Sequence, residues 1–215
     1  MMMILYHFPT SPYARRVRLA LAHKGLTAEL RDARKQPEHM REVERLHPCR
    51  TVPVLIDDPR VIVDSTAILH YLDRKHPEPP LWPAGEVGAE VFEYLALANS
   101  AIDVLIDLGL RYQALHDHPQ FPAVRIQQIG RTQRALEAIA ARVSACNPAA
   151  PLCGDRWSAA DMAIFTLVVW LETMPLRAAT FPPAGKMLAL GWTLPATLST
   201  WADPHRQRDD VRALD

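Results

Sequence analysis

The distribution of apolar residues changes once along this chain, and that change constrains the fold more than any other feature. Before residue 77, short apolar runs alternate with amphipathic segments, a pattern typical of strands alternating with helices. Residues 77–88 then hold four prolines and two glycines, and beyond them apolar residues recur almost entirely at helical spacing. The sequence therefore predicts an α+β protein with a first domain at residues 1–76, a linker at 77–88 and an all-helical domain at 89–215.

The first domain is predicted to follow the order β-α-β-α-β-β-α. Strands are expected at residues 4–8, 28–32, 52–56 and 61–63, and helices at 13–24 and 38–46 and from Ser65 to about Lys75. The last two strands are rich in β-branched residues and flank Asp57-Asp58-Pro59-Arg60, a turn sequence typical of a β-hairpin. Ser65 is the expected N-cap of the third helix, beginning at Thr66.

The second domain is predicted to be a helical bundle. Residues 90–115 and 123–146 carry helical periodicity over many turns, and the helix at 158–173 is apolar enough to be buried all round. Only short helices fit between Pro175 and Pro195. Ser158 and Asp161 form the Ser-x-x-acid pattern of a capping box, so their role is predicted to be structural.

Charge and composition exclude several function classes. With 24 basic and 24 acidic residues, the chain has no basic excess to neutralise nucleic-acid phosphates. The longest apolar stretch, Met162 to Leu171, is too short to span a bilayer, and no signal-like segment opens the chain, so we expect a cytoplasmic protein without a membrane partner. Its three cysteines and the His116 and His118 pair form no ligand pattern, so no metal is predicted.

The element order and the Val52-Pro53 step before the third strand resemble a thioredoxin fold, in which the corresponding proline is cis. Thioredoxins carry Cys-x-x-Cys at the start of the first helix. This chain has Ser11-Pro12-Tyr13-Ala14 there, which excludes dithiol exchange by the protein's own thiols.

Over its full length the sequence resembles the serine-type branch of the glutathione transferase family. The resemblance rests on Ser11-Pro12 before Arg16-Val17-Arg18, on Val52-Pro53-Val54-Leu55, on Asp64-Ser65-Thr66-Ala67-Ile68, on the stretch from Gly154 to Asp161, and on the ending Leu194-Pro195 to Leu214. It implies a thioredoxin-like domain that binds glutathione as co-substrate, a helical domain that binds a small hydrophobic electrophile, and a homodimer.

The resemblance implies that Ser11 is the catalytic residue, its hydroxyl donating a hydrogen bond to the sulfur of glutathione. The residues alone permit a second interpretation, in which Ser11 is simply the N-cap of a helix with Pro12 at its first position. Tyr6 and Tyr13 are the competing donors.

The glutathione-binding residues implied by the resemblance are Val52, through its backbone, with Pro53, Asp64 and Ser65. The loop ahead of Val52 departs from the family pattern, because Thr51 stands where relatives often have lysine or glutamine. Arg50 either replaces that side chain in gripping the glycine carboxylate or is a solvated loop residue.

The acceptor pocket is expected to come from the stretch Ile102 to Tyr112, with Tyr13 and Tyr112 as candidate lining residues. The leading hypothesis is a glutathione S-transferase, an enzyme that transfers alkyl or aryl groups in detoxification. Two alternatives stay open: a non-catalytic regulatory or binding protein of the same fold, and a glutathione-dependent isomerase or dehalogenase.

Overall fold

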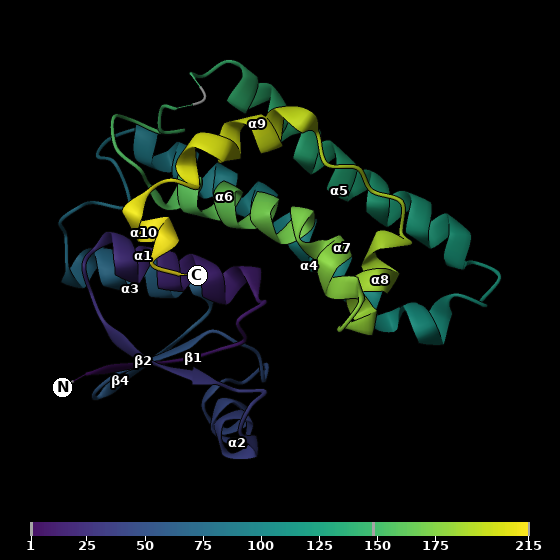
Figure 1. The fold of residues 1–215 in the computed structure, drawn as a ribbon, viewed down its shortest axis with the longest axis horizontal. Helices are drawn as coiled ribbons and strands as arrows, with labels where there is room; N and C mark the ends of the chain where they lie inside the picture. Colours follow the sequence, from purple (N-terminus) through teal and green to yellow (C-terminus); the bar gives the residue numbers. More distant parts are fainter. Residues whose placement is uncertain (1, 148, 215) are drawn as a thin grey trace.

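The computed structural model describes residues 2–147 and 149–214 and shows a four-stranded sheet beside a bundle of helices (Figure 1). The first half contains, in chain order, β1 (Met3–His7), α1 (Pro12–His23), β2 (Ala28–Asp32), α2 (Pro37–Leu46), β3 (Val54–Asp57), β4 (Arg60–Val63) and α3 (Ser65–Lys75). The predicted element order and the α+β class are confirmed.

The sheet has the strand order β2-β1-β3-β4, with β1 parallel to β2 and antiparallel to β3. Helices α1 and α3 cover the sheet face that looks toward the helical half, and α2 lies on the opposite face (Figure 1). Leu5 and Leu55 are paired across β1 and β3 and fully buried beneath α1 and α3. Tyr6 and Val54 belong to a smaller core that Val43 of α2 completes.

The second half is helical. Its elements are α4 (Val87–Leu115), α5 (Phe121–Ser144), α6 (Ala159–Glu172), α7 (Met174–Ala178), α8 (Pro182–Leu188), α9 (Ala196–His205) and α10 (Asp209–Arg212). The three long helices and the short ones after them agree with the predictions from periodicity and from proline placement.

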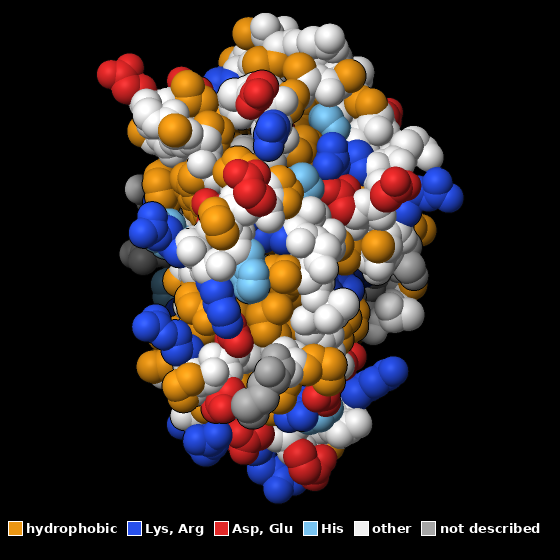
Figure 2. Space-filling view, turned by 90° about the vertical axis from the view of Figure 1, so that its left-hand side faces the viewer, with side chains coloured by type: hydrophobic (Ala, Val, Ile, Leu, Met, Phe, Trp, Pro, Cys, Tyr) orange, Lys and Arg blue, Asp and Glu red, His pale blue; other side chains and the backbone are white. Residues whose placement is uncertain are grey.

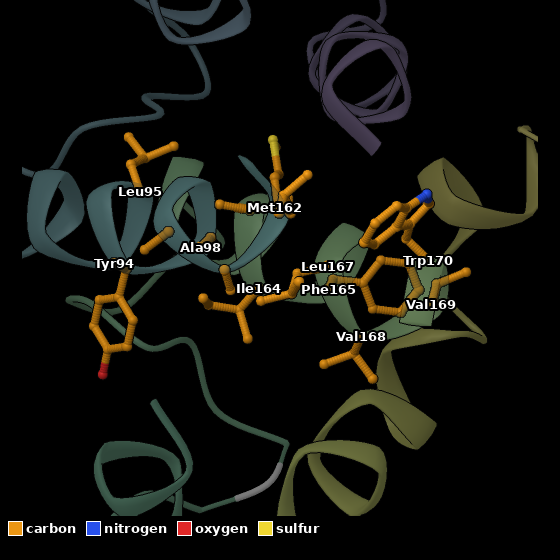
Figure 3. Packing of buried hydrophobic residues seen from close by; sticks show 14 of the residues in the cluster. Tyr94, Leu95, Ala98, Met162, Ile164, Phe165, Leu167, Val168, Val169 and Trp170 are labelled. Carbon is orange, nitrogen blue, oxygen red and sulfur yellow. The ribbon is translucent and has the colours of Figure 1, made fainter. Parts of the chain in front are cut away.

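Helix α6 is the centre of the core, because residues 159–171 are all buried. Figure 3 shows Leu95 and Ala98 of α4 packed beside it, with Val168 and Trp170 of α6 pointing to different sides. A helix surrounded by apolar neighbours cannot leave its first N–H groups to water. Ser158 and Asp161 meet that need as a capping box. Burial raises the pKa of Asp161 to about 6, although its carboxylate accepts hydrogen bonds from the Ser158 and Leu152 amides, each at 2.8 Å.

The segment that joins the halves is held in place. Leu81, within the predicted linker, is fully buried; its amide donates to Asp73 (2.7 Å) and its carbonyl accepts from the Ala159 amide (2.9 Å). The buried Lys24 ammonium donates to Asp73 (3.0 Å) and to the carbonyls of His76 (2.7 Å) and Pro79 (2.6 Å). Helix α4 already includes residues 87 and 88.

The end of the chain returns to the first half, where α10 packs on α1 (Figure 1). Asp210 lies 2.7 Å from the His23 ring and 2.8 Å from the Arg208 guanidinium. Burial alone would raise the pKa of Asp210, but these two partners outweigh it and lower the pKa to about 2.

On the face shown in Figure 2, acidic and basic side chains are interspersed, in keeping with the zero net charge. Over the described residues, none of the helices combines the length and apolar run that a bilayer crossing requires. Within the same residues, His, Cys, Asp and Glu side chains do not gather into a group of three able to hold a metal ion.

Candidate active site

A cleft of about 670 Å³ lies between the two halves, a size typical of small-molecule sites. The first half supplies the turn after β1, the loop before β3 and the start of α3, and the second half supplies one side of α4 with α6, α7 and α8. Of the predicted site residues, Ser11, Tyr13, Arg50, Val52, Pro53, Asp64 and Ser65 all line it. The cleft therefore brings together predicted site residues as far apart in the sequence as Ser11 and Ser65.

Ser11 is half-buried and is the N-cap of α1, where its Oγ accepts a hydrogen bond from the Ala14 amide at 3.3 Å. Pro12 occupies the first turn, where a missing N–H is no loss. Accepting one bond leaves the hydroxyl proton of Ser11 available to a ligand in the cleft. Capping and ligand contact are thus compatible at this residue.

Tyr13 also lines the cleft, but its hydroxyl donates to the carboxylate of Asp103 on α4. Burial, together with that hydrogen bond, raises the pKa of the Tyr13 phenol above its ordinary value. The bond bridges the two halves and occupies the phenol proton. Tyr6 is 1% exposed and accepts from Arg31 at 2.9 Å in the small core under α2, and the cleft does not include it.

Arg16 is a fully buried cation beneath the cleft. Its Nη1 donates to Asn99 of α4 at 3.0 Å and more weakly to the Ser65 hydroxyl at 3.5 Å. Burial lowers the pKa of Arg16 to about 10, so the guanidinium stays charged at neutral pH. It supplies positive charge beneath the start of α3.

The start of α3 differs from the prediction in its cap. Asp64, not Ser65, is the N-cap: its carboxylate accepts from the amides of Thr66 (2.8 Å) and Ala67 (3.0 Å), and Ser65 is a buried first helical residue. The expectation for Ser65 was wrong because Asp64 adopts φ of 73°, which brings its own side chain over the helix end. Arg50, at φ 55°, is the other non-glycine residue with positive φ in the described chain, and both line the cleft. Such conformations often accompany functional sites.

The loop before β3 presents a backbone edge to the cleft. The Val52-Pro53 peptide is cis, as in the thioredoxin fold that the sequence resembles. His47 orders this loop: its Nδ1 accepts from the Cys49 amide (3.0 Å), so its Nε2 carries the proton and donates to the Thr51 hydroxyl (3.1 Å). Thr51 is therefore engaged within the loop, and the exposed Arg50 is the cation at this edge.

The opposite wall is largely apolar. It consists of Ile106, Leu110, Trp170, Phe181, Ala184 and Met187. Gly109 makes this wall possible, since a Cβ there would lie 2.3 Å from Cγ of Met187. The predicted stretch from Ile102 to Tyr112 contributes to the wall, but Tyr112 does not line the cleft; its ring stacks on His116 and meets Phe121 edge-on.

Sequence reasoning missed several cleft residues, among them Asn99, Asp103 and Asp107 on α4 and Arg34 and Arg177. A signal for the first three was present, because polar residues recur every four positions along an otherwise apolar helix. Arg177 carried no such signal, since it lies on a short helix whose position depends on tertiary packing.

The sequence is similar to a known protein family and to several curated proteins. Residues 5–80 match the family model described as glutathione S-transferase, N-terminal domain. The chain is 46% identical over 81 residues (37% of each chain) to glutathione S-transferase Z1 of Arabidopsis thaliana. It is 40% identical over 112 residues (50% of each chain) to a probable maleylacetoacetate isomerase of Vibrio cholerae. The matches thus span 37% and 50% of these curated relatives' lengths.

Solved structures extend the likeness to the whole fold. A glutathione S-transferase of Methylobacterium radiotolerans, crystallised with glutathione sulfonate, is 25% identical, with a TM-score of 0.76 over 99% of this chain and 94% of that one. A thioredoxin-like half without a dithiol, joined to a helical half across a shared cleft, defines the class of glutathione-transferase folds. Residues 5–80 belong to the glutathione S-transferase N-terminal domain family, and the chain as a whole has the fold of that solved transferase.

Proposed function

We propose that this protein binds glutathione in the first-half side of the cleft and directs its thiolate at a small electrophile held against the apolar wall. The observation that carries this proposal is the placement of the Ser11 hydroxyl at the N-terminus of α1, facing a cleft with a polar side and an apolar side.

The chemistry required of Ser11 is modest. A free thiol has a pKa near 8.5, so only a few per cent is thiolate at pH 7. A hydrogen bond to a charged group contributes about 1.5–3 kcal/mol, and a helix N-terminus about 0.3–1 kcal/mol more. At about 1.4 kcal/mol per pKa unit, these contributions lower the thiol pKa by roughly two units. The thiolate then attacks the electrophilic carbon, a C–S bond forms, and the leaving group departs with its electron pair.

The remaining groups of glutathione have matching partners. The backbone of Val52 can pair with the cysteinyl unit, and the Ser65 hydroxyl with the Ser65 amide, the first of α3, can hold the γ-glutamyl carboxylate. Arg16, charged and buried below Ser65, favours an anion there. Arg50 lies at the other end, where the glycine carboxylate would come.

A glutathione-dependent isomerase is the second candidate, favoured by the likeness to the Vibrio cholerae protein named a probable maleylacetoacetate isomerase. In that reaction the sulfur adds to a carbon–carbon double bond, the resulting single bond rotates, and the sulfur leaves again. The isomerase reaction therefore needs the same thiolate site. A non-catalytic binding protein is the third candidate, and it needs no thiolate.

One experiment separates these candidates. We expect saturable, stoichiometric binding of glutathione by titration calorimetry, and turnover of 1-chloro-2,4-dinitrobenzene followed by absorbance. Binding without aryl-halide turnover, but with isomerisation of a cis-configured conjugated diacid, would favour the isomerase. Binding with neither activity would favour a binding protein. Absence of glutathione binding would contradict the proposal as a whole.

We also propose a homodimer, as the family resemblance implies. Phe92 on α4 is 49% exposed and its ring lies 5.5 Å from that of Trp82, which leaves an aromatic pair at the surface for a partner subunit. Light scattering at micromolar concentration should give about twice the chain mass of 24.2 kDa. A mass equal to the single chain would contradict the dimer, and Phe92→Ser should shift the mass toward that value.

A further inference from the structure

Two arginines meet beside the candidate thiolate site. Arg34 follows β2, and its Nη1 donates to the Thr10 hydroxyl at 3.0 Å. Arg177 lies on α7, and its Nη1 reaches the Thr10 carbonyl at 3.5 Å. Both arginines line the cleft, and Thr10 directly precedes Ser11. Two positive charges from opposite halves of the protein therefore converge one residue from the hydroxyl assigned to the sulfur.

Neither arginine is neutralised by a contact. Among the described residues, no carboxylate lies within ion-pair distance of Arg34 or Arg177. The nearby acids have other partners: Asp103 accepts from Tyr13, and Asp107 pairs with Arg111 at 2.7 Å. The Asp32 carboxylate accepts a hydrogen bond from the Arg34 backbone amide at 2.9 Å, and it acts on the Arg34 guanidinium through its charge. Burial, together with the positive charge of Arg34, lowers the pKa of Arg177 to about 10, so the Arg177 guanidinium stays charged at neutral pH. Arg34 is charged as well, because an arginine is not deprotonated in proteins.

The two arginines differ in how many side-chain N–H groups remain available to a ligand. Arg177 donates to the carbonyls of Trp170 and Thr173 as well as Thr10, so its hydrogen-bonding capacity is largely used within the protein. Among the residues that the structure describes, the Arg34 side chain donates to Thr10 alone, and an arginine carries five N–H groups. Its guanidinium packs 4.2 Å from the Phe8 ring centre and 5.0 Å from that of Phe181, which fixes the plane it presents.

We propose that the acceptor end of the cleft selects electrophiles that carry a carboxylate, with Arg34 binding that carboxylate directly. Arg177 is a positioning residue that holds the Thr10 turn and adds positive charge. The apolar body of the electrophile lies against Phe181 and Trp170. This inference rests on the proposed function, because it names the substrate class of the same site.

The test uses a matched pair of acceptors, 4-chloro-3,5-dinitrobenzoate and its methyl ester. In both, the glutathione thiolate attacks the ring carbon that bears chlorine, a C–S bond forms, and chloride leaves with the C–Cl electrons. The variants are Arg34→Met, Arg34→Lys, and Lys35→Met as a control that removes the neighbouring exposed charge.

For the benzoate, we expect kcat/KM to fall about tenfold or more in Arg34→Met, because a hydrogen bond to a charged group is lost. For the ester it should change less than twofold, and the KM for glutathione should stay constant. Arg34→Lys should recover part of the benzoate activity, and Lys35→Met should leave both acceptors unchanged.

Three outcomes would overturn the inference. These are equal losses with both acceptors, a raised KM for glutathione that accounts for the loss, and no preference for the benzoate in the wild type. If the wild type turns over neither acceptor, calorimetry with the two pre-formed glutathione conjugates decides. Tighter, Arg34-dependent binding of the carboxylate conjugate would keep the subsite while the proposed function fails. Equal binding of both conjugates would remove the subsite.

Discussion

Ser11→Ala should raise the pKa of bound glutathione by one unit or more and reduce activity at neutral pH about tenfold or more. The reason is the loss of a hydrogen bond to the thiolate, worth about 1.5–3 kcal/mol at about 1.4 kcal/mol per unit. Because the pKa rises, the missing thiolate returns as the pH is raised, so activity should partly recover under alkaline conditions. Thiolate absorbance against pH, with glutathione saturating, measures the shift directly.

The same substitution also removes the cap of α1, which costs about 1 kcal/mol of stability. The capping effect and the effect on the thiol are separable, since a folded variant that binds glutathione can be titrated. An unshifted titration in such a variant would remove Ser11 from the mechanism. Tyr13→Phe is the matched control: because the Tyr13 hydroxyl is held by Asp103, the thiol pKa should move little. A large shift in Tyr13→Phe instead would make the tyrosine the donor.

Lys24→Met should lower the free energy of unfolding by about 3–5 kcal/mol, the usual loss when one partner of a buried ion pair is removed. The side chain of Lys24 is fully buried, and its ammonium donates hydrogen bonds to the Asp73 carboxylate and to the carbonyls of His76 and Pro79. Without it, the partly buried Asp73 carboxylate loses its cation and keeps the Leu81 amide, and the carbonyls of His76 and Pro79 lose the ammonium donor. Against a typical total of about 5–15 kcal/mol, the loss is severe.

Urea denaturation monitored by circular dichroism measures this loss. Lys35→Met is the control, because Lys35 is exposed and its removal should change stability by less than about 0.5 kcal/mol. The folded fraction of Lys24→Met should still bind glutathione with wild-type affinity, since Lys24 does not line the cleft. A loss below about 1 kcal/mol would show that water replaces the ammonium in this network.

The fold was predictable because the sequence patterns that indicate its helices and strands each lie within a short segment of the chain. Apolar periodicity indicated α4, α5 and α6, and the β-branched runs on either side of Asp57-Asp58-Pro59-Arg60 indicated the hairpin. The cap of α3 was mispredicted because Asp64 and Ser65 are both good capping residues. The choice between them depends on the φ angle of Asp64, which the residue types do not encode.

The first-half side of the cleft was predictable from motifs, and those residues do lie together, although their roles remain predictions. The second-half side was harder, because its residues come from separate helices. Arg177 reaches Thr10, 167 positions away, only once α7 has docked. Tyr112 illustrates the converse error: it lies in the expected stretch, yet its helical position turns the ring toward His116.

The anchored segment around Leu81 has a consequence for ligand affinity. With Leu81 buried, Lys24 tying down the connection, and α10 packed on α1 through Asp210, the two halves are fixed against each other without any ligand. Proteins whose lobes swing freely lose part of their gross binding energy in closing around a ligand. Here the width of the cleft is set during folding, so a ligand need not spend binding energy on bringing the two halves together.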